Sequence, residues 1–570
     1  MPSTLNRAVL GLLLAATLAG ALTLDRRTWP EIVGDEATYL MQAQSLAWDF
    51  DLRYSRQDYE RFVAQWGRKP EGLILQSPDG GTTLFYGKPS AYPLFIAPFV
   101  RLSPTRGAAI ANALFLALAA AIATRSLERR IGPAAALWVA VWIFGSVAFI
   151  YVFWAHSDLF QMCLAAIALA LAYGHSAEDT GRRFALRWLA VGALLGLVFM
   201  ARPFYGTLLL PAALAVPAGR RRTGIAALAA GAVSLVLVAA LANVAARGTW
   251  TSYAGDRQSF YSYTGYPKVE LPAESWGQRT AEHGTASWVE GASAQVDVAS
   301  RQTMWNVLYF LVGRHVGVLP YFLPLVLGFF AWRRGEGRWA LVLAVVVTAA
   351  CFLVIRPFNF WGGGGAIANR YFLPVYPALW FVAARPARAV WALVVAALAA
   401  PFLWPLWTAP RGFPIDAEGG YRHVSAVAQR WLPYETTLSH LKPAGQEDII
   451  HNGLWVKLLT PALRAEADGG RLRLASGRPG DLLIGSREPL QTLRLRLPPG
   501  GPRQLTLSGA EVTETLQRRD GGVTLRLLFP GPRARHRMWW AEEDVWLYEL
   551  RLAPQADDVA FQLLPEPATP

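Results

Sequence analysis

Long apolar runs separated by short polar connections occupy the chain from its N-terminus to about residue 408. Residues 108–124, 134–152 and 224–244 contain no charged side chain and approach the ~20 residues that a helix needs to cross the hydrocarbon core of a bilayer. Uncharged runs of this length are rare in soluble cores. The pattern predicts about eleven transmembrane helices, over residues 5–24, 106–124, 133–152, 157–174, 187–201, 204–218, 224–244, 318–332, 339–355, 371–384 and 389–408.

The first apolar run permits two interpretations. Arg7, an apolar stretch and Ala19-Gly20-Ala21 follow one another in the order of a cleaved signal peptide. The alternative is a retained first transmembrane helix. We favour retention, because many spans follow and the next segment fits a loop tethered to that helix.

Short connections rich in arginine alternate with connections that are longer or of mixed charge. By the positive-inside rule the basic connections are cytoplasmic, so the alternate ones face outward. The outward set includes the long loops 25–105 and 245–317 and the short connections 153–156, 202–203 and 356–370. The basic set comprises Arg125, Arg129, Arg130, Arg182, Arg183, Arg220, Arg221, Arg222, Arg333, Arg334, Arg338, Arg385 and Arg388.

The tail from residue 409 to residue 570 has a different pattern. Apolar and polar residues alternate in 472–474, 493–497, 523–528 and 546–552, and Gly, Pro and Asp turns separate these segments. Period-two alternation between turn signals predicts an antiparallel β domain, which we interpret as a sandwich. A short helix is expected at 421–432. The fold class is therefore a polytopic α-helical membrane domain, 1–408, followed by an extracytoplasmic β-rich domain, 409–570.

The composition agrees with this division. Hydrophobic residues make up 53% of the chain and charged residues 16%, with a net charge of +14. The positive excess is arginine in short loops, which fits the positive-inside rule and contact with anionic lipid rather than nucleic acid. Cys163 and Cys351 lie inside apolar runs, so they predict neither a disulfide framework nor a metal cluster.

Two adjacent carboxylates, Asp35 and Glu36, open the first outer loop just beyond the first span. The segment from Tyr39 to Trp48 follows with apolar residues at helical spacing, which predicts a helix in the membrane interface. Asp35 also has a structural interpretation as the cap of that helix, because Asp is a favoured N-cap residue. A capping geometry would still hold the carboxylate rigidly enough for chemistry.

The order Gly34-Asp35-Glu36-x-x-Tyr39, placed after a first span and opening a long outer loop, resembles the GT-C superfamily. These polytopic glycosyltransferases use polyprenyl-phosphate sugars as donors, and they include protein O-mannosyltransferases and lipid A aminoarabinose transferases. The resemblance covers roughly residues 5–405 and implies that an acidic residue of this loop is the catalytic base. We expect Asp35 to be the base, Glu36 its neighbour or the alternate base, and Tyr39 a substrate contact.

A second stretch, Trp361-Gly362-Gly363-Gly364-Gly365 followed by Asn369-Arg370, resembles bacterial members of the same superfamily. A glycine run lets the backbone approach a ligand and presents N–H groups to an anion. The Arg370 guanidinium could hold a phosphate through two parallel hydrogen bonds. The alternative is an outer turn with an arginine that reaches the interface. We expect Trp361, Asn369 and Arg370 to bind substrate.

Three further sites lie at outward ends of spans. Arg314-His315 also resembles those proteins and would suit a lipid-linked phosphodiester, although headgroup anchoring explains Arg314 equally well. His156-x-Asp158 occupies a very short turn; this spacing occurs in metal sites, but no other ligand cluster completes one, so His156 is expected to hold acceptor or phosphate. Asp158 is open to interpretation as a helix cap. Arg202 either completes a cationic pocket or anchors the membrane boundary.

Aromatic residues gather in two outward regions. The loop 248–305 carries many Trp, Tyr and Phe residues, which stack on sugars and line lipid interfaces, and it is expected to cover the site. In the tail, Trp539, Trp540 and Trp546 are interpreted as core aromatics, with glycan stacking as the alternative.

These features predict an inverting glycosyltransferase of the bacterial cytoplasmic (inner) membrane with an extracytoplasmic site. Its partners would be a polyprenyl-phosphate-linked sugar, an extracytoplasmic glycan, lipid or protein acceptor, and membrane lipid. No cofactor or metal is predicted, although a divalent ion could assist. The alternative function is a transporter or flippase of a lipid-linked glycan. That function would place charges at mid-membrane depth or on both faces, whereas the span interiors are nearly free of charge. A non-catalytic assembly protein would not need the clustered motifs.

Overall fold

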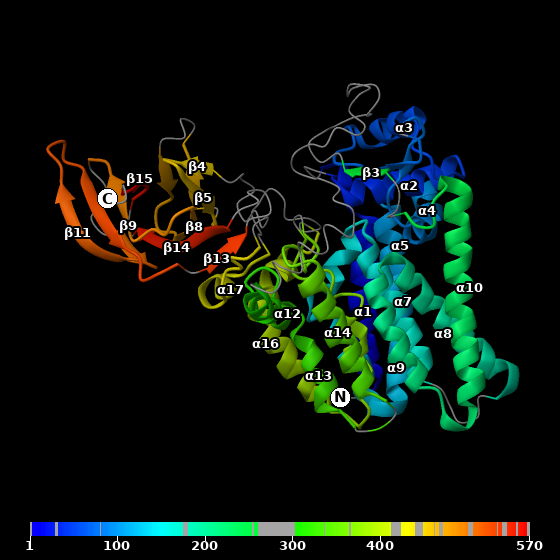
Figure 1. Ribbon diagram of the computed structural model, residues 1–570. Coiled ribbons are helices and arrows are strands. Elements are labelled where there is room, and N and C mark those ends of the chain that lie inside the picture. The colour runs from blue at the N-terminus through cyan, green and yellow to red at the C-terminus, as the bar shows by residue number, and fades with distance from the viewer. Residues whose placement is uncertain are drawn as a thin grey trace.

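The structure is a computed structural model, and a helical part and a β-rich part lie next to each other in it (Figure 1). It describes residues 3–28, 32–79, 81–174, 180–252, 256–259, 302–333, 335, 337–363, 366–411, 423–438, 449–460, 462–466, 471–499, 505–532, 534–537, 544–554 and 557–566. The predicted fold class, a polytopic helical membrane protein with a C-terminal β-rich region, is confirmed.

Five helical stretches of the described residues are long and apolar enough to cross a membrane: Ser3–Leu22, Gly107–Phe144, Gly181–Ala201, Ala218–Arg247 and Ala389–Thr408. The predicted number of spans therefore stays a prediction. The helices of this part are α1 (Ser3–Leu22), α5 (Gly107–Ile131), α6 (Ala135–Phe144), α7 (Ser157–Tyr173), α8 (Gly181–Ala201), α9 (Leu209–Leu214), α10 (Arg221–Arg247), α12 (Val318–Tyr321), α13 (Val326–Phe330), α14 (Trp339–Ile355), α15 (Tyr376–Trp380) and α16 (Ala389–Thr408).

Two predicted spans are less regular than the apolar pattern suggested. The run 133–152 leaves the α-helix after Phe144, and the Ser146 hydroxyl accepts the N–H of Ala148 as the chain enters the 3-10 helix η3 (Val147–Phe153). The run 371–384 contains only the short helix α15, preceded by turns. Hydropathy alone does not reveal such interruptions, because the residues remain apolar through them.

The first outer loop folds into its own layer above the helices (Figure 1). It contains α2 (Asp35–Trp48), α3 (Arg56–Trp66), α4 (Ala91–Leu102) and the strands β1 (Ile74–Ser77) and β2 (Phe85–Tyr86), and β3 (Asp256–Ser259) completes an antiparallel sheet of order β2-β1-β3. The expected interfacial helix begins at Asp35 rather than Tyr39. Its residues from Glu36 to Ser45 are all buried by other parts of the protein, and the prediction that this helix lies in the membrane interface stays a prediction.

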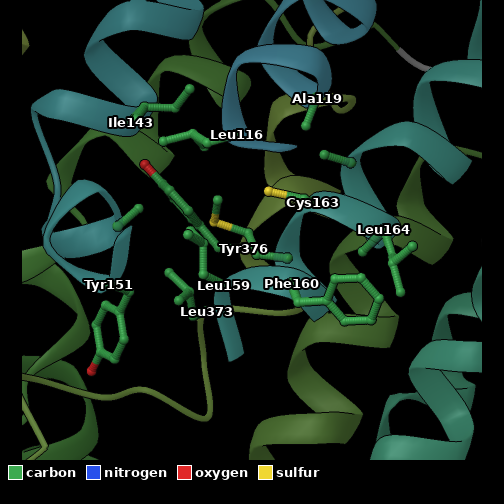
Figure 2. Packing of buried hydrophobic residues seen from close by; sticks show 14 of the residues in the cluster. Leu116, Ala119, Ile143, Tyr151, Leu159, Phe160, Cys163, Leu164, Leu373 and Tyr376 are labelled. Atoms are coloured by element: carbon green, nitrogen blue, oxygen red, sulfur yellow. The ribbon is translucent and has the colours of Figure 1, made fainter. Parts of the chain in front are cut away.

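A close-packed apolar core supports the start of α7, where the candidate site begins (Figure 2). Leu159 and Cys163 of α7 pack with Leu116 of α5 and with Tyr376, whose hydroxyl donates to the carbonyl of Trp142 over 3.1 Å. Cys163 and Cys351 are both free thiols. This dense packing fixes the start of α7 relative to α5 and the turns before α15.

Two six-stranded antiparallel sheets form the C-terminal part, with orders β10-β14-β8-β5-β4 (β13 pairing with β14) and β11-β12-β9-β15-β7-β6. Leu493, Leu495, Leu550 and Phe561 are among the buried residues of the core of this part. The strands expected at 472–474, 493–497, 523–528 and 546–552 are confirmed. The strands are β4 (Ile449–His451), β5 (Leu454–Leu458), β6 (Leu463–Ala465), β7 (Leu472–Leu474), β8 (Gly480–Ser486), β9 (Thr492–Leu497), β10 (Leu505–Ser508), β11 (Glu511–Gln517), β12 (Val523–Leu528), β13 (Ala534–Arg537), β14 (Asp544–Pro554) and β15 (Val559–Pro565).

A connecting segment, 423–438, joins the two parts. It contains α17 (Ala426–Trp431), where a helix over 421–432 was expected. Val424, Ala428 and Leu438 pack into the core of the helical part, whereas Tyr434 packs with Leu459 and other residues of the β-rich part. The boundary drawn at residue 408 remains a prediction, and the segment 423–438 packs against both parts.

Candidate active site

Asp35 is the first residue of α2, but it does not cap that helix. Gly34 occupies the cap position with φ 65°, and no side chain makes a capping hydrogen bond there. The Asp35 carboxylate instead pairs through Oδ1 with Nζ of Lys88 at 2.6 Å. Its Oδ2 lies 2.8 Å from Nε2 of His156 and 3.4 Å from Nη2 of Arg370. The capping interpretation was therefore wrong, and the carboxylate belongs to a cluster of charged side chains.

His156 and Asp158 enter this cluster from the start of α7. Nδ1 of His156 lies 2.7 Å from Oδ2 of Asp158, and Oδ1 of Asp158 accepts from Nη1 of Arg202 at 3.3 Å. His156 occupies the cap position of α7 and its helix start has no side-chain cap bond, so the capping interpretation of Asp158 was also wrong. Both side chains are fully buried. The turn 153–156 therefore places the imidazole of His156 between the carboxylates of Asp35 and Asp158.

The glycine-containing turn before Arg370 makes room for the arginine itself. The backbone N–H of Arg370 donates to the carbonyl of Trp361, with an N–O distance of 3.0 Å. A Cβ on Gly362, which has φ +108°, would lie 2.2 Å from Nε of Arg370. The guanidinium also lies over the ring of Trp154, 5.3 Å from its centroid. Trp361 thus positions Arg370 through its backbone, and Gly362 is needed for space as well as for its backbone conformation.

Asn369, Tyr39 and Arg202 surround the cluster in different ways. Oδ1 of Asn369 accepts the N–H of Phe372 at 3.1 Å, so Asn369 shapes the turn that follows Arg370. The Tyr39 hydroxyl is 3.1 Å from Oγ of Ser157, and the Tyr39 ring meets the His156 ring edge-on at 5.4 Å. Arg202 stacks over Tyr371 with its guanidinium carbon 3.9 Å from the ring centroid. All three lie at the site, and their roles toward substrate stay predictions.

Lys88 is the functional candidate that sequence analysis did not identify. Its carbonyl accepts from Nε2 of Gln42 and Nη1 of Arg247, both over 3.4 Å, so α2 and the end of α10 hold its backbone. A signal was present in the composition. Lysine is scarce in this arginine-rich chain (Lys69, Lys88, Lys268, Lys442 and Lys457), and Lys88 lies between Gly87 and Pro89 in the outer loop.

The side chains of the cluster are mostly buried, but three of them keep a small exposed fraction. The Asp35 side chain is 12% exposed, Lys88 8% and Arg370 9%, whereas His156 is not exposed. Burial alone would raise the pKa of the Asp35 carboxyl, but the charges of Lys88 and Arg370 and the hydrogen bond with His156 outweigh burial and hold the pKa well below its usual range. Burial lowers the pKa of Lys88 to about 8, against the opposing attraction of Asp35.

Glu36 does not join the cluster. Its carboxylate pairs with Arg26, and its Oε1 accepts the N–H of Ala155 at 3.1 Å. Successive helix residues point about 100° apart, so only one carboxylate of the pair can face the site. Glu36 therefore supports the backbone next to His156, and the structure does not place it as an alternate base.

Arg314 and His315 lie in a second buried cluster rather than beside Asp35. Nη1 of Arg314 lies 3.3 Å from Oδ2 of Asp481, in β8 of the C-terminal part. Nδ1 of His315 lies 2.7 Å from Oε2 of Glu435, and the N–H groups of His315 and Val316 donate to Oε1 of Glu435 at 2.6 and 3.0 Å. The structure does not bring this pair to the Asp35 cluster, because their partners tie them to the C-terminal region.

Two other expectations have limited support in the described residues. Most of the aromatic loop 248–305 lies outside them, and so do Trp539 and Trp540; Trp546 packs against the β core. Within the part of the chain that the structure describes, no group of three or more His, Cys, Asp and Glu side chains is arranged to hold a metal ion. Lys88, Arg202 and Arg370 are the cations that compensate the carboxylates of the site.

No protein-family model and no curated protein matches the chain. Among solved structures, the chain is similar to ArnT from Cupriavidus metallidurans bound to undecaprenyl phosphate, with a TM-score of 0.39 and 15% identity over 71% of this chain. It is also similar to apo ArnT from the same organism, with a TM-score of 0.37 and 16% identity over 70% of this chain. The match spans 64% of the length of either ArnT chain.

Proposed function

We propose that this protein is a membrane glycosyltransferase that transfers a sugar from a polyprenyl-phosphate donor to the hydroxyl of an extracytoplasmic acceptor. The observation that carries the proposal is the Asp35 cluster. A carboxylate that is partly exposed lies within 2.6–3.4 Å of an ammonium group, an imidazole and a guanidinium. These are the groups that removing a proton and stabilising a phosphate require.

The charge of the cluster favours an anionic ligand. Lys88, Arg202 and Arg370 contribute three positive charges against the two carboxylates of Asp35 and Asp158 when His156 is neutral. Lysine has three N–H donors and arginine five, so the ion pairs with Asp35 leave donors for a phosphate. The phosphate of a polyprenyl donor, anchored in the membrane by its tail, would occupy the exposed side of Lys88 and Arg370.

The proposed reaction uses the carboxylate of Asp35 and the cations around it. The acceptor oxygen attacks the anomeric carbon, and the bond from that carbon to the phosphate oxygen breaks. Negative charge grows on the leaving polyprenyl phosphate, and Lys88 and Arg370 stabilise it. Asp35 receives the proton of the acceptor hydroxyl. Because the displacement is direct, the configuration of the anomeric carbon inverts.

The competing function is transport of a lipid-linked glycan. A transporter would bind the same lipid phosphate, but it would not need a partly exposed carboxylate among the phosphate-binding cations. Asp35 and Lys88 both belong to the chain segment between α1 and α5, which is predicted to be an outer loop, and neither lies in a predicted membrane-spanning helix. This location favours chemistry at one face of the membrane over passage through it.

A transfer assay distinguishes the two functions. Three purified proteins are compared: the wild type, Asp35→Asn and Asp25→Asn. Each is supplied with radiolabelled polyprenyl-phosphate hexoses and pentoses and with candidate acceptors. Asp25 is a matched control, because its carboxylate forms an exposed pair with Arg27 in the same loop. We expect Asp35→Asn to lose about 10²–10⁴-fold in transfer, while Asp25→Asn keeps the wild-type rate. Undiminished transfer by Asp35→Asn would remove Asp35 as the base, and Glu36→Gln is tested in parallel. Labelled lipid that crosses vesicle membranes without transfer would favour the transporter.

A further inference from the structure

Nε2 of His156 has two close neighbours with opposite requirements. Oδ2 of Asp35, 2.8 Å away, accepts a hydrogen bond as a carboxylate, whereas Nη1 of Arg370, also 2.8 Å away, can only donate one. One imidazole nitrogen satisfies a single neighbour at a time. Its lone pair accepts from Arg370, or its N–H donates to Asp35. Nε2 is therefore the atom at which the cluster has two alternative hydrogen-bond states.

The opposite ring nitrogen has only one state. Nδ1 lies 2.7 Å from Oδ2 of Asp158, whose carboxylate also faces Nη1 of Arg202 at 3.3 Å and Nε of Arg370 at 3.8 Å. These cations keep Asp158 ionised. The Nδ1–Oδ2 contact lacks the alignment of a hydrogen bond, but the negative charge of the carboxylate 2.7 Å away favours a proton on Nδ1 in both states. With Nδ1 protonated, Nε2 holds a lone pair in the neutral ring and a proton in the imidazolium.

We propose that His156 takes over the proton that Asp35 removes from the acceptor hydroxyl, and that Asp158 is the positioning residue for this transfer. The inference rests on the proposed function. As the acceptor oxygen bonds to the anomeric carbon, the carbon–oxygen bond to the phosphate breaks and its electron pair stays on the phosphate. The hydroxyl proton moves to Oδ2 of Asp35 and then to Nε2 of His156. After the products leave, it returns through Asp35 to water.

Burial explains why one group receives the proton and the other stores it. Asp35 is 12% exposed and within reach of an acceptor, whereas His156 has no exposed surface. The cations around Asp35 hold its pKa well below the usual range, so a proton on this carboxyl is readily lost. A base 2.8 Å from the same oxygen is placed to remove it.

Arg370 connects the relay to the donor. While its Nη1 donates to Nε2, the lone pair of His156 is occupied and cannot take a proton. A donor phosphate attracts the guanidinium and competes for the same N–H group, which frees the lone pair. His156 therefore becomes a base when the donor is bound, so proton removal from the acceptor coincides with the presence of its reaction partner.

The remaining groups around the ring complete its electrostatic surroundings. Lys88 pairs with Asp35, which lies next to the ring. Glu36 accepts a hydrogen bond from the N–H of Ala155, the residue before His156. Trp154 lies beside the ring at a centroid distance of 4.5 Å, and Tyr39 meets it edge-on at 5.4 Å. The ring is thus held in one orientation, which a directed proton transfer requires.

The test uses acceptors that differ in how readily they lose a proton. The full chain and His156→Gln, whose amide forms hydrogen bonds but takes no proton, are given a polyprenyl-phosphate hexose or pentose, whichever the wild type uses. The acceptors are an alkyl alcohol and a phenol, whose hydroxyl has a pKa of ~10 as in tyrosine. We expect His156→Gln to lower transfer to the alkyl alcohol about 10²-fold and transfer to the phenol less than about tenfold. Asp158→Asn should give the same selective pattern, and Asp25→Asn, which removes a carboxylate outside the cluster, should keep both rates.

Each outcome decides between the relay and a simpler role. Equal losses with the two acceptors would overturn the relay, because they would indicate that His156 only shapes the site. If His156→Gln does not fold, as judged by thermal unfolding of the purified protein, Asp158→Asn carries the same comparison. Absence of transfer by the wild type with every donor would overturn the proposed function itself, and the relay with it.

Discussion

Nζ of Lys88 lies 2.6 Å from Oδ1 of Asp35, and this ion pair ties the loop before α4 to the first turn of α2. In the proposed reaction the two side chains also act together. Lys88 keeps the carboxylate ionised and ready to accept a proton, while its remaining N–H groups face the position proposed for the donor phosphate. The pH at which Lys88 loses its charge should therefore limit activity.

Transfer is expected to fall as the pH rises through about 8, the lowered pKa of Lys88. Stability should respond in the opposite direction. Between about pH 8 and the unfolded value of 10.5, the unfolded chain binds a proton at this lysine that the folded chain does not, so its contribution to the free energy of unfolding increases with pH. Parallel profiles of transfer rate and thermal midpoint test this separation. Activity that declines only together with the thermal midpoint would argue against Lys88 as the titrating group. In Lys88→Arg, which stays charged, the alkaline decline should disappear from whatever activity remains.

Gly362→Ala is expected to abolish most transfer by displacing Arg370. The added Cβ would lie 2.2 Å from Nε of Arg370 and 2.3 Å from its Cγ, at a backbone φ of +108°. Gly67→Ala is the matched control, because Gly67 has φ +68° and an added Cβ meets nothing within 4 Å. The control carries only the backbone cost of roughly 1–2 kcal/mol. Transfer rates per folded molecule should fall in Gly362→Ala to the level of Arg370→Gln. An unchanged rate in Gly362→Ala would show that Arg370 does not need its present position.

Local patterns were sufficient to predict the fold class. Apolar runs and period-two alternation depend on neighbouring residues, so helices and strands such as β9 and β12 appear where the sequence places them. The same patterns missed the break after Phe144 and the burial of α2. Both depend on what packs against the segment, and an amphipathic segment does not reveal whether its apolar face meets lipid or protein.

The site was predictable only in part, for a related reason. Asp35, His156 and Arg370 could be singled out because each lies at an outward end of a predicted span. Lys88 could not, because it meets Asp35 only through the tertiary fold. Arg314 resembled a site residue by the same local criterion, but Asp481, far along the chain, neutralises it. Charge at a span end indicates a candidate, and only the fold identifies its partner.

Glu435→Ala is expected to destabilise the protein without weakening donor binding. Burial would raise the pKa of Glu435, but His315 and the N–H groups that it accepts outweigh burial and lower it. Removing the carboxylate leaves His315 and two N–H groups without their acceptor, which costs about 3–5 kcal/mol for a broken buried pair. Thermal unfolding and retention of radiolabelled polyprenyl phosphate measure the two effects. Exposed Glu488→Ala serves as the control and should change neither. Lost donor binding in a folded Glu435→Ala protein would return His315 to the phosphate site.

Because the folded pKa is lowered, the stabilisation by Glu435 should also be lost as the pH falls below its unfolded value of about 4.5.

Asp35→Asn and Glu36→Gln should have opposite effects although the residues are adjacent. Glu36 compensates Arg26, whose side chain is only 5% exposed, so Glu36→Gln removes the carboxylate partner of a buried charge and should lower stability by about 3–5 kcal/mol. The folded fraction should still transfer sugar at nearly the wild-type rate, since the amide oxygen of Gln can accept the N–H of Ala155. Asp35→Asn should lose transfer and keep stability better, because its side chain is 12% exposed, compared with 1% for Glu36. Rates normalised to folded protein, with thermal midpoints for both variants, make the comparison. If Glu36→Gln lost transfer as completely as Asp35→Asn while remaining folded, the separation of a supporting carboxylate from a reacting one would fail.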